Sequence, residues 1–312
     1  DVGGSPYAVH GYELHPALGA KGDLPKIKKK LNDACLRLFL DLVSNHMAVD
    51  HPWTRSHPER FVMGSEEDLA EDPVTFYPVK AGEKTVILAH GNDPNFPAWT
   101  DTAQLNYFNP DTRREMIETV KHLARVADGV RCDVAMMLLN EVHESVWGPR
   151  LLNGRWKKPA HEFWTEAIAA AKEIRSDFLF IAEVYWGLEW KLQELGFDYT
   201  YDKVLYDRLV YMGALEVRGH LWADEAYQRR SARFIENHDE PRAATAFGRD
   251  KSLAASVVAS TLKGMRLFHD GQMKGWRIKL PVQLSRGPDE PVEPEVAMHY
   301  HKLLAATKHA AF

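Results

Sequence analysis

The 312-residue chain is poor in cysteine, with only Cys35 and Cys132, which lie far apart and in apolar surroundings. Two cysteines are too few for a disulfide framework, and their spacing is not that of a metal site. We therefore expect two buried free thiols. Such thiols favour a reducing, cytoplasmic location, although the sequence alone leaves the compartment open.

Long apolar runs and strong basic runs are also missing. No stretch of 18 apolar residues exists, which argues against a membrane-spanning helix. The N-terminal residues show no basic segment followed by an apolar signal region. The densest basic run, Lys26–Lys30, is typical of a solvated helix face, and the formal net charge is -5. Nucleic acid and membranes are therefore not expected partners.

What the chain does have is a regular alternation of short apolar runs and amphipathic helices, which predicts a parallel α/β fold. With 45% hydrophobic residues it can bury a sizeable core. We expect six strands, at residues 38–43, 129–133, 178–184, 197–201, 233–237 and 265–269. The main helices are expected at residues 23–32, 112–128, 160–175, 252–262 and 294–308.

One segment, Met47 to Tyr107, breaks this alternation. It is rich in Pro, Gly, Asp and His, and it has the length of an inserted subdomain rather than a loop. The alternating pattern of residues 84–88 predicts a strand inside it.

The ends of four predicted strands are polar in a way that packing does not explain. The first end holds residues 41–46, including Asn45 and His46, and the second holds Arg131 and Asp133. The third is Glu183, and the fourth holds residues 236–239, including His238 and Asp239. Functional residues of parallel α/β folds gather at such carboxyl ends. A single carboxylate there is more often a helix cap or an ion pair, so the prediction rests on the four ends together.

In this order the four strand ends resemble the four short conserved regions of the α-amylase family, glycoside hydrolase family 13. Residues 5–19, 103–107 and 268–272 resemble further motifs of that family. The resemblance implies a TIM-type (β/α)8 barrel with a small subdomain inserted after strand three. The expected parts are the start of the barrel at 1–46, the inserted subdomain at 47–107, and the rest of the barrel at 108–312.

The resemblance also implies roles for three carboxylates. Retaining glycosidases use one carboxylate as nucleophile and another as acid/base. Asp133 would be the nucleophile, and Glu183 would protonate the leaving oxygen. Asp239 would stabilise the oxocarbenium-like transition state. Arg131 would keep Asp133 ionised through a charge-assisted hydrogen bond.

Further positions match residues that bind substrate or metal in the family. His46 and His238 would donate to sugar hydroxyls, and Tyr7 would stack on the sugar at the cleavage point. Asn45 matches a calcium ligand of many relatives, so a structural Ca²⁺ ion is an expectation. No cofactor is required for the chemistry.

Two departures from the family pattern matter. Where many relatives have Lys-His to bind sugar on the leaving-group side, this chain has Met136 and Met137. Core packing is the expected role of both methionines. Glu141, His143 and Trp147 in the following loop are then candidates for building the acceptor side.

The second departure is the number of strands, six rather than eight. Residue 1 would already lie in the loop after strand two, so strands one and two are missing from this sequence. A barrel without them has unpaired edges. We therefore expect self-association that covers the open edges.

The function expected from the resemblance is a retaining α-glycoside hydrolase of α-1,4-glucans or malto-oligosaccharides. An α-glucan transglycosylase or a sugar isomerase of the same family would share the catalytic residues and remains an alternative. A non-catalytic carbohydrate-binding relative is a further alternative. No Gly-rich loop supports a phosphate-binding barrel.

Overall fold

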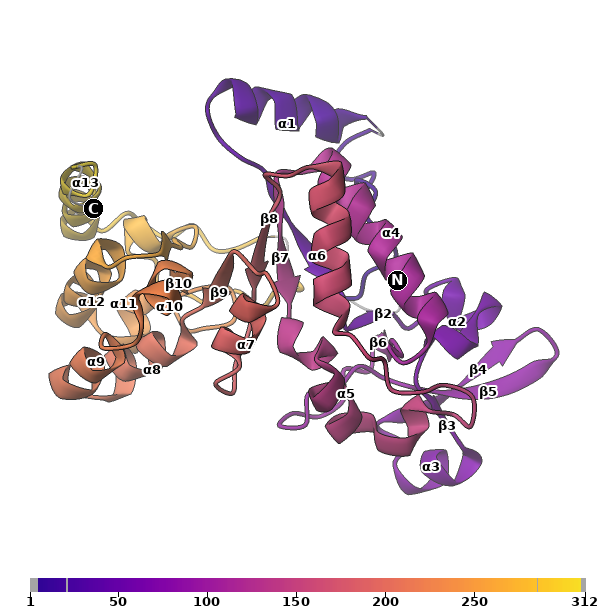
Figure 1. The fold of residues 1–312 in the computed structure, drawn as a ribbon. Helices are drawn as coiled ribbons and strands as arrows, with labels where there is room; N and C mark the ends of the chain where they lie inside the picture. The colour runs from indigo at the N-terminus through magenta and orange to yellow at the C-terminus, as the bar shows by residue number, and fades with distance from the viewer. Residues whose placement is uncertain (1–4, 21, 285, 310–312) are drawn as a thin grey trace. The chain divides into compact units, whose positions relative to one another are not determined.

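The computed structural model describes residues 5–20, 22–284 and 286–309, and its elements are labelled in Figure 1. The chain forms two compact units. The first comprises residues 1–183 and 194–197, and the second comprises residues 184–193 and 198–312. Each unit contains three parallel strands, so the six strands expected from the sequence are all found.

In the first unit, β7 (Gly129–Asp133) lies between β1 (Phe39–Val43) and β8 (Leu179–Ala182), and all three are parallel. The register places Asp41 opposite Arg131 and Val43 opposite Asp133. The helices that alternate with these strands are α1 (Asp23–Asp33), α4 (Pro110–Val126) and α6 (Phe163–Ile174). Helix α4 packs against both α6 and β7, which fixes β7 from one side (Figure 1).

The start of α4 shows why its sequence forms a helix there. Asn109 is the N-cap, and its side-chain oxygen accepts a hydrogen bond from the backbone N–H of Asp111. Pro110 occupies the first helical position, where no backbone N–H is needed. Met116, Val120 and Leu123 then recur on one face and are buried.

The antiparallel strands of the described residues also lie in the first unit. They are β2 (His46–Ala48) with β6 (Thr102–Gln104), and a sheet in the order β3 (Met63–Gly64), β5 (Lys84–Ala89), β4 (Phe76–Ala81). The short helices here and after β7 are α2 (Trp53–Ser56), η1 (Pro58–Arg60), α3 (Glu66–Glu71), η2 (Ala135–Leu138), α5 (Asn140–Trp147) and η3 (Gly148–Leu151). The strand predicted at 84–88 is confirmed. The boundaries of an inserted subdomain at 47–107 stay a prediction, because this segment belongs to the same compact unit as β1, β7 and β8.

In the second unit, β10 (Ser231–Arg233) pairs in parallel with both β9 (Tyr199–Tyr201) and β11 (Met265–Arg266). Its helices are α7 (Glu189–Glu194, whose last residue falls in the first unit), α8 (Lys203–Tyr211), α9 (Ala214–His220), α10 (Glu225–Arg229), α11 (Ala243–Ala246), α12 (Arg249–Thr261), η4 (Gln272–Lys274) and α13 (Pro294–Ala306).

A buried polar network ties β10 to α8 and α9. The Asp202 carboxylate caps α8 by accepting from the backbone N–H of Leu205 at 3.2 Å. The same carboxylate faces His220 Nε2 at 2.8 Å and accepts from Arg233 Nε at 3.1 Å. The side chains of Asp202 and Arg233 are at most 1% exposed. A buried charge is tolerated only when it is paired in this way.

Two expectations from the sequence are wrong. The strand predicted at 233–237 ends at Arg233, because the chain turns beyond it: the Asn237 side-chain oxygen accepts the backbone N–H groups of Asp239 and Glu240. Cys35 is exposed and only Cys132 is buried. Cys35 follows the end of α1 in a left-handed backbone conformation, at φ 58°, so its apolar neighbours in sequence do not enclose it.

No helix in residues 5–20, 22–284 and 286–309 is both long enough and apolar enough to cross a membrane. The expected self-association stays a prediction.

The three strands of the first unit approach closely at Gly129. A Cβ atom at this position would lie 2.3 Å from Phe39 Cε1 and 2.7 Å from the backbone oxygen of Leu179. We expect Gly129→Ala to destabilise the protein by about 1–3 kcal/mol, since the backbone of β8 cannot yield easily. Gly11→Ala is the control, with nothing within 4 Å of the added atom. Urea unfolding should separate the two variants, and equal midpoints would contradict this packing.

Candidate active site

Arg131 lies at the centre of the candidate site, on β7 in the first unit. Its Nη1 donates to Asp133 Oδ1 at 2.8 Å, and its Nη2 forms an ion pair with Glu183 Oε2, also at 2.8 Å. The three side chains are nearly enclosed, with exposed fractions of 8% for Arg131, 8% for Asp133 and 3% for Glu183. Residues two apart on a strand point to the same side, and Glu183 directly follows the neighbouring strand β8. One guanidinium thus faces both carboxylates.

Glu183 is also held by the backbone of the residues that follow Asp133. The N–H of Val134 donates to Glu183 Oε2 at 2.8 Å, and the N–H of Ala135 donates to the backbone oxygen of Glu183 at 2.9 Å. This requires Val134 to adopt a left-handed conformation, at φ 36° and ψ 49°. For a β-branched residue that conformation is strained. The strain lies directly between the two carboxylates.

Tyr7, Asp41 and His46 surround this centre. The Tyr7 hydroxyl donates to Asp41 Oδ2 at 3.3 Å, and the Arg131 guanidinium lies 5.6 Å from the centroid of the Tyr7 ring. Arg131 Nη1 is also 3.6 Å from Asp41 Oδ1. His46 is buried and hydrogen-bonded to the backbone of Tyr7. Five predicted site residues of the first unit therefore lie in one neighbourhood: Tyr7, His46, Arg131, Asp133 and Glu183.

The environment shifts two of these groups. Burial, and then the Glu183 carboxylate, raise the pKa of Asp133 well above its usual range, and Arg131 opposes the rise. Arg131 therefore acts in the expected direction but does not outweigh burial. Burial lowers the pKa of His46 to about 4. His46 is consequently a neutral imidazole at neutral pH.

Asp239 and His238 lie in the second unit, in the turn between β10 and α11. His238 Nε2 is 3.1 Å from Asp239 Oδ2, and the exposed fractions of the two side chains are 27% and 46%. Asn237 shapes the turn by accepting the backbone N–H of Asp239 at 2.9 Å and that of Glu240 at 2.8 Å. The Asp239 side chain is thus accessible on a tightly folded turn.

Asn45, the expected calcium ligand, is engaged in a reciprocal amide pair. Gln104 Nε2 donates to Asn45 Oδ1 at 2.9 Å, and Asn45 Nδ2 donates to Gln104 Oε1 at 3.2 Å. The amide oxygen expected to bind the ion already accepts a hydrogen bond in a reciprocal pair. Among the described residues, no group of three His, Cys, Asp or Glu side chains could hold a metal ion. Calcium ligation by Asn45 has no support from its neighbours.

The segment after Asp133 is mostly core. Met136 and Met137 are fully buried in η2, as expected. The suggestion that His143 and Trp147 build an acceptor site is wrong, because both are buried on α5. Trp147 belongs to a hydrophobic cluster, and His143 Nε2 accepts the backbone N–H of Tyr107 at 3.3 Å. Of the three candidates, only Glu141 is exposed.

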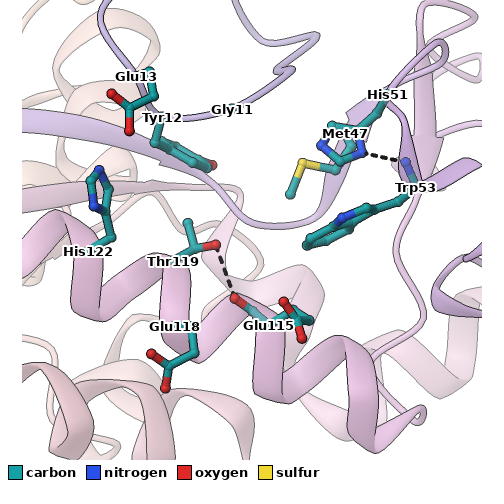
Figure 2. A pocket seen from close by; sticks show the side chains of 10 residues that line it. All are labelled: Gly11, Tyr12, Glu13, Met47, His51, Trp53, Glu115, Glu118, Thr119 and His122. Carbon is teal, nitrogen blue, oxygen red and sulfur yellow. Dashed lines mark hydrogen bonds between the residues drawn. The ribbon is translucent and has the colours of Figure 1, made fainter. Parts of the chain in front are cut away.

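A separate cavity of about 300 Å³ lies between residues 11–13, β2, α2 and α4 (Figure 2). Met47 and Trp53 point into it, and carboxylates of α4 line the opposite side. These carboxylates are paired: Glu115 lies 3.4 Å from Arg60, and Glu118 lies 2.8 Å from Lys121. The lining does not include Arg131, Asp133 or Glu183. This cavity is therefore not the candidate active site.

Sequence reasoning placed Asp41 at a polar strand end but gave it no role, and it missed the contribution of Val134. The strand pairing explains the position of Asp41: it lies opposite Arg131 on β7, as Val43, two residues later, lies opposite Asp133. Val134 has no signal in the sequence: nothing in the order of its neighbours indicates a left-handed valine.

The sequence profile described as "Alpha amylase, catalytic domain" matches residues 5–279 of the chain. Alpha-amylase 3 of Dictyoglomus thermophilum is 24% identical over 299 residues, which cover 89% of this chain and 55% of that protein. Alpha-amylase MalA of Haloarcula japonica is 26% identical over 295 residues, covering 87% of this chain and 37% of that protein. The chain therefore spans only part of the length of these relatives.

Among solved structures, the maltogenic alpha-amylase AmyB from Thermotoga neapolitana is similar, with a TM-score of 0.69 and 25% identity. The similarity covers 98% of this chain and 64% of AmyB. The resemblance and the fold class expected from the strand ends are thereby confirmed. With a profile match from residue 5 to residue 279, the chain belongs to the α-amylase family, glycoside hydrolase family 13, and has the α/β fold related to the (β/α)8 barrel of its catalytic domain.

Proposed function

We propose that this chain is the catalytic part of a retaining α-glycoside hydrolase that acts on α-1,4-glucans or malto-oligosaccharides. The observation that carries the proposal is the Arg131 guanidinium, placed 2.8 Å from oxygens of both Asp133 and Glu183. Double displacement at an anomeric carbon requires two carboxyl groups held close together, one as nucleophile and one as acid/base. The names of the similar amylases support the same substrate class.

In the first step, an Asp133 oxygen bonds to the anomeric carbon while the bond from that carbon to the leaving oxygen breaks. Glu183 gives its proton to the leaving oxygen. In the second step, the Glu183 carboxylate takes a proton from water, and the water oxygen displaces Asp133 from the anomeric carbon. The configuration is retained because each step inverts it once.

The first step needs one proton on the two carboxyl groups together. Arg131 supplies one positive charge to two buried carboxyl groups, so ionising both would leave a buried negative charge uncompensated. The raised pKa of Asp133, caused by burial and then by Glu183, expresses this cost. A pair that shares one proton can place it on Glu183 when a substrate oxygen approaches Glu183.

The remaining side chains would bind the sugar. Neutral His46 has no charge to repel a developing oxocarbenium ion, and its pKa of about 4 keeps it so at neutral pH. Tyr7 offers a ring face, which suits the apolar face of a pyranose. The family resemblance assigns the binding of sugar hydroxyls to His238 and the stabilisation of the positive transition state to the Asp239 carboxylate.

An α-glucan transglycosylase is the second candidate. Buried Met136 and Met137 stand where many relatives have the Lys-His that binds sugar on the leaving-group side, so the acceptor side is built differently here. A maltosyltransferase of Mycolicibacterium smegmatis is 27% identical over 207 residues. Product analysis on maltotriose separates the two. Hydrolysis yields maltose and glucose, whereas transfer yields longer oligosaccharides.

Glu183→Gln should lower kcat on maltotriose about 10²–10⁴-fold, the usual contribution of general acid–base catalysis. Activity on α-maltosyl fluoride should fall much less in the glycosylation step, because fluoride leaves without a proton. Glu173→Gln changes an exposed carboxylate of α6 and should leave both rates unchanged. The rate of the first step is measured as pre-steady-state release of the leaving group. If Glu183→Gln lowered this rate equally on both substrates, Glu183 would not be the acid.

Asp133→Asn should abolish turnover and raise thermal stability at pH 7. Folding raises the pKa of this carboxyl group from about 3.9, its value in the unfolded protein. As the pH increases from about 3.9 through the pKa of the folded protein, the free energy of unfolding therefore falls. The Asp133→Asn variant does not lose stability in this way, so its melting temperature at pH 7 should exceed that of the parent. Each kcal/mol of stability raises the melting temperature by roughly 2–4 °C. Below about pH 4 the two should converge.

Asp177→Asn is the control for that measurement. Hydrogen bonding to Arg175 holds the pKa of Asp177 below its usual range, so its ionised form stabilises the folded protein and its loss should bring no gain at pH 7. A melting temperature of the Asp133→Asn variant at or below that of the parent at pH 7 would show that burial of Asp133 carries no such cost.

A further inference from the structure

One buried ion pair closes the turn that carries Asp239. Arg242 Nη1 donates to Glu236 Oε1 at 2.7 Å, and the backbone N–H of Ala243 donates to Glu236 Oε2, also at 2.7 Å. Glu236 is 1% exposed and Arg242 is 5% exposed. Residues 236 and 242–243 are therefore fastened together, and the five residues between them form a closed loop.

Arg242 also fastens this loop to the segment after β11. Its Nη1 donates to the backbone oxygen of Asp270 at 2.5 Å, and its Nε donates to the backbone oxygen of Ile278 at 3.2 Å. The guanidinium lies 5.8 Å from the centroid of the Trp276 ring. His269 Nδ1 faces both members of the pair, at 2.8 Å from Arg242 Nη1 and 3.1 Å from Glu236 Oε1. One side chain thus joins three segments of the second unit.

Within the closed loop, both backbone polar groups of Asp239 are engaged. Its N–H donates to Asn237 Oδ1 at 2.9 Å, and its backbone oxygen accepts from Lys279 Nζ. Lys279 comes directly after Ile278, whose oxygen accepts from Arg242. The backbone on which the Asp239 carboxylate is mounted is therefore held through the same segment that Arg242 fastens.

We propose that Arg242 is a positioning residue for Asp239, acting through Glu236 and through residues 276–279. This inference rests on the proposed function, in which Asp239 stabilises the transition state. Without Arg242, the buried Glu236 carboxylate would lose its ion-pair partner, which is costly and favours opening of the turn. A displacement of about 1 Å at a catalytic group costs on the order of 100-fold in rate.

The test compares Arg242→Gln, Arg242→Lys and the control Arg249→Gln, which removes a half-exposed arginine of α12 paired at the surface. Arg242→Gln should lower kcat on α-maltosyl fluoride about 100-fold, with kcat and kcat/KM falling together. Arg242→Lys keeps the charge and should restore part of the rate. The control should match the parent.

A double variant separates positioning from general loosening. If Arg242 acts only through Asp239, Arg242→Gln combined with Asp239→Asn should be no slower than Asp239→Asn alone. Losses that multiply, or a kcat of the folded Arg242→Gln variant within about threefold of the parent, would overturn the proposal.

Hydrogen exchange measures the turn independently of activity. Backbone amides of residues 237–243 should exchange faster in the Arg242→Gln variant than in the parent, while those of α12 and α13 keep their protection. Unchanged exchange in 237–243 would refute the inference even if the parent were an active hydrolase. If the parent were inactive but residues 237–243 exchanged faster in the Arg242→Gln variant, the proposed function would be refuted. The role of Arg242 in holding the turn would still stand.

Discussion

Arg131 brings a single positive charge to two carboxyl groups in a part of the molecule from which water is largely excluded. The candidate site depends on this imbalance of charge. Burial and then the Glu183 carboxylate raise the pKa of Asp133 well above its usual range, and Arg131 offsets this only in part. The raised pKa favours retention of a proton beside Arg131. Double displacement needs such a proton at the start of each cycle. Neighbouring residues hold this site in place: the Tyr7 hydroxyl donates to Asp41, and the Val134 N–H donates to Glu183.

The parallel strands and the polarity of their ends could be predicted because both follow from local chemistry. The apolar run 38–43 is too short and too apolar for a surface helix. Residues two apart on a strand share a face, so the spacing of Arg131 and Asp133 is enough to predict that their side chains meet. That these side chains also meet Glu183 follows from the adjacency of β7 and β8, which the family resemblance implied.

Other features depend on contacts between distant segments, which periodicity does not reveal. Phe234 and Ile235 are apolar and buried, yet they lie outside β10, because β11 offers partners only to Ala232 and Arg233. Polar His143 is enclosed by packing around α5. Arg242 looks like an ordinary surface arginine in the sequence, and only the return of the chain at residues 270 and 278 encloses it.

The left-handed backbone of Val134 has a consequence for reading mutational data. Such a conformation costs about 1–3 kcal/mol, and packing of the residues that follow must offset this cost. Met136, Met137 and Leu138 are fully buried, and Trp164 Nε1 donates to the backbone oxygen of Ala135 at 2.8 Å. A core substitution that lets Val134 relax would withdraw its N–H from Glu183 while the fold persists. Substitutions of Trp164, a fully buried residue of α6, would then lower turnover through the backbone of residues 134–135.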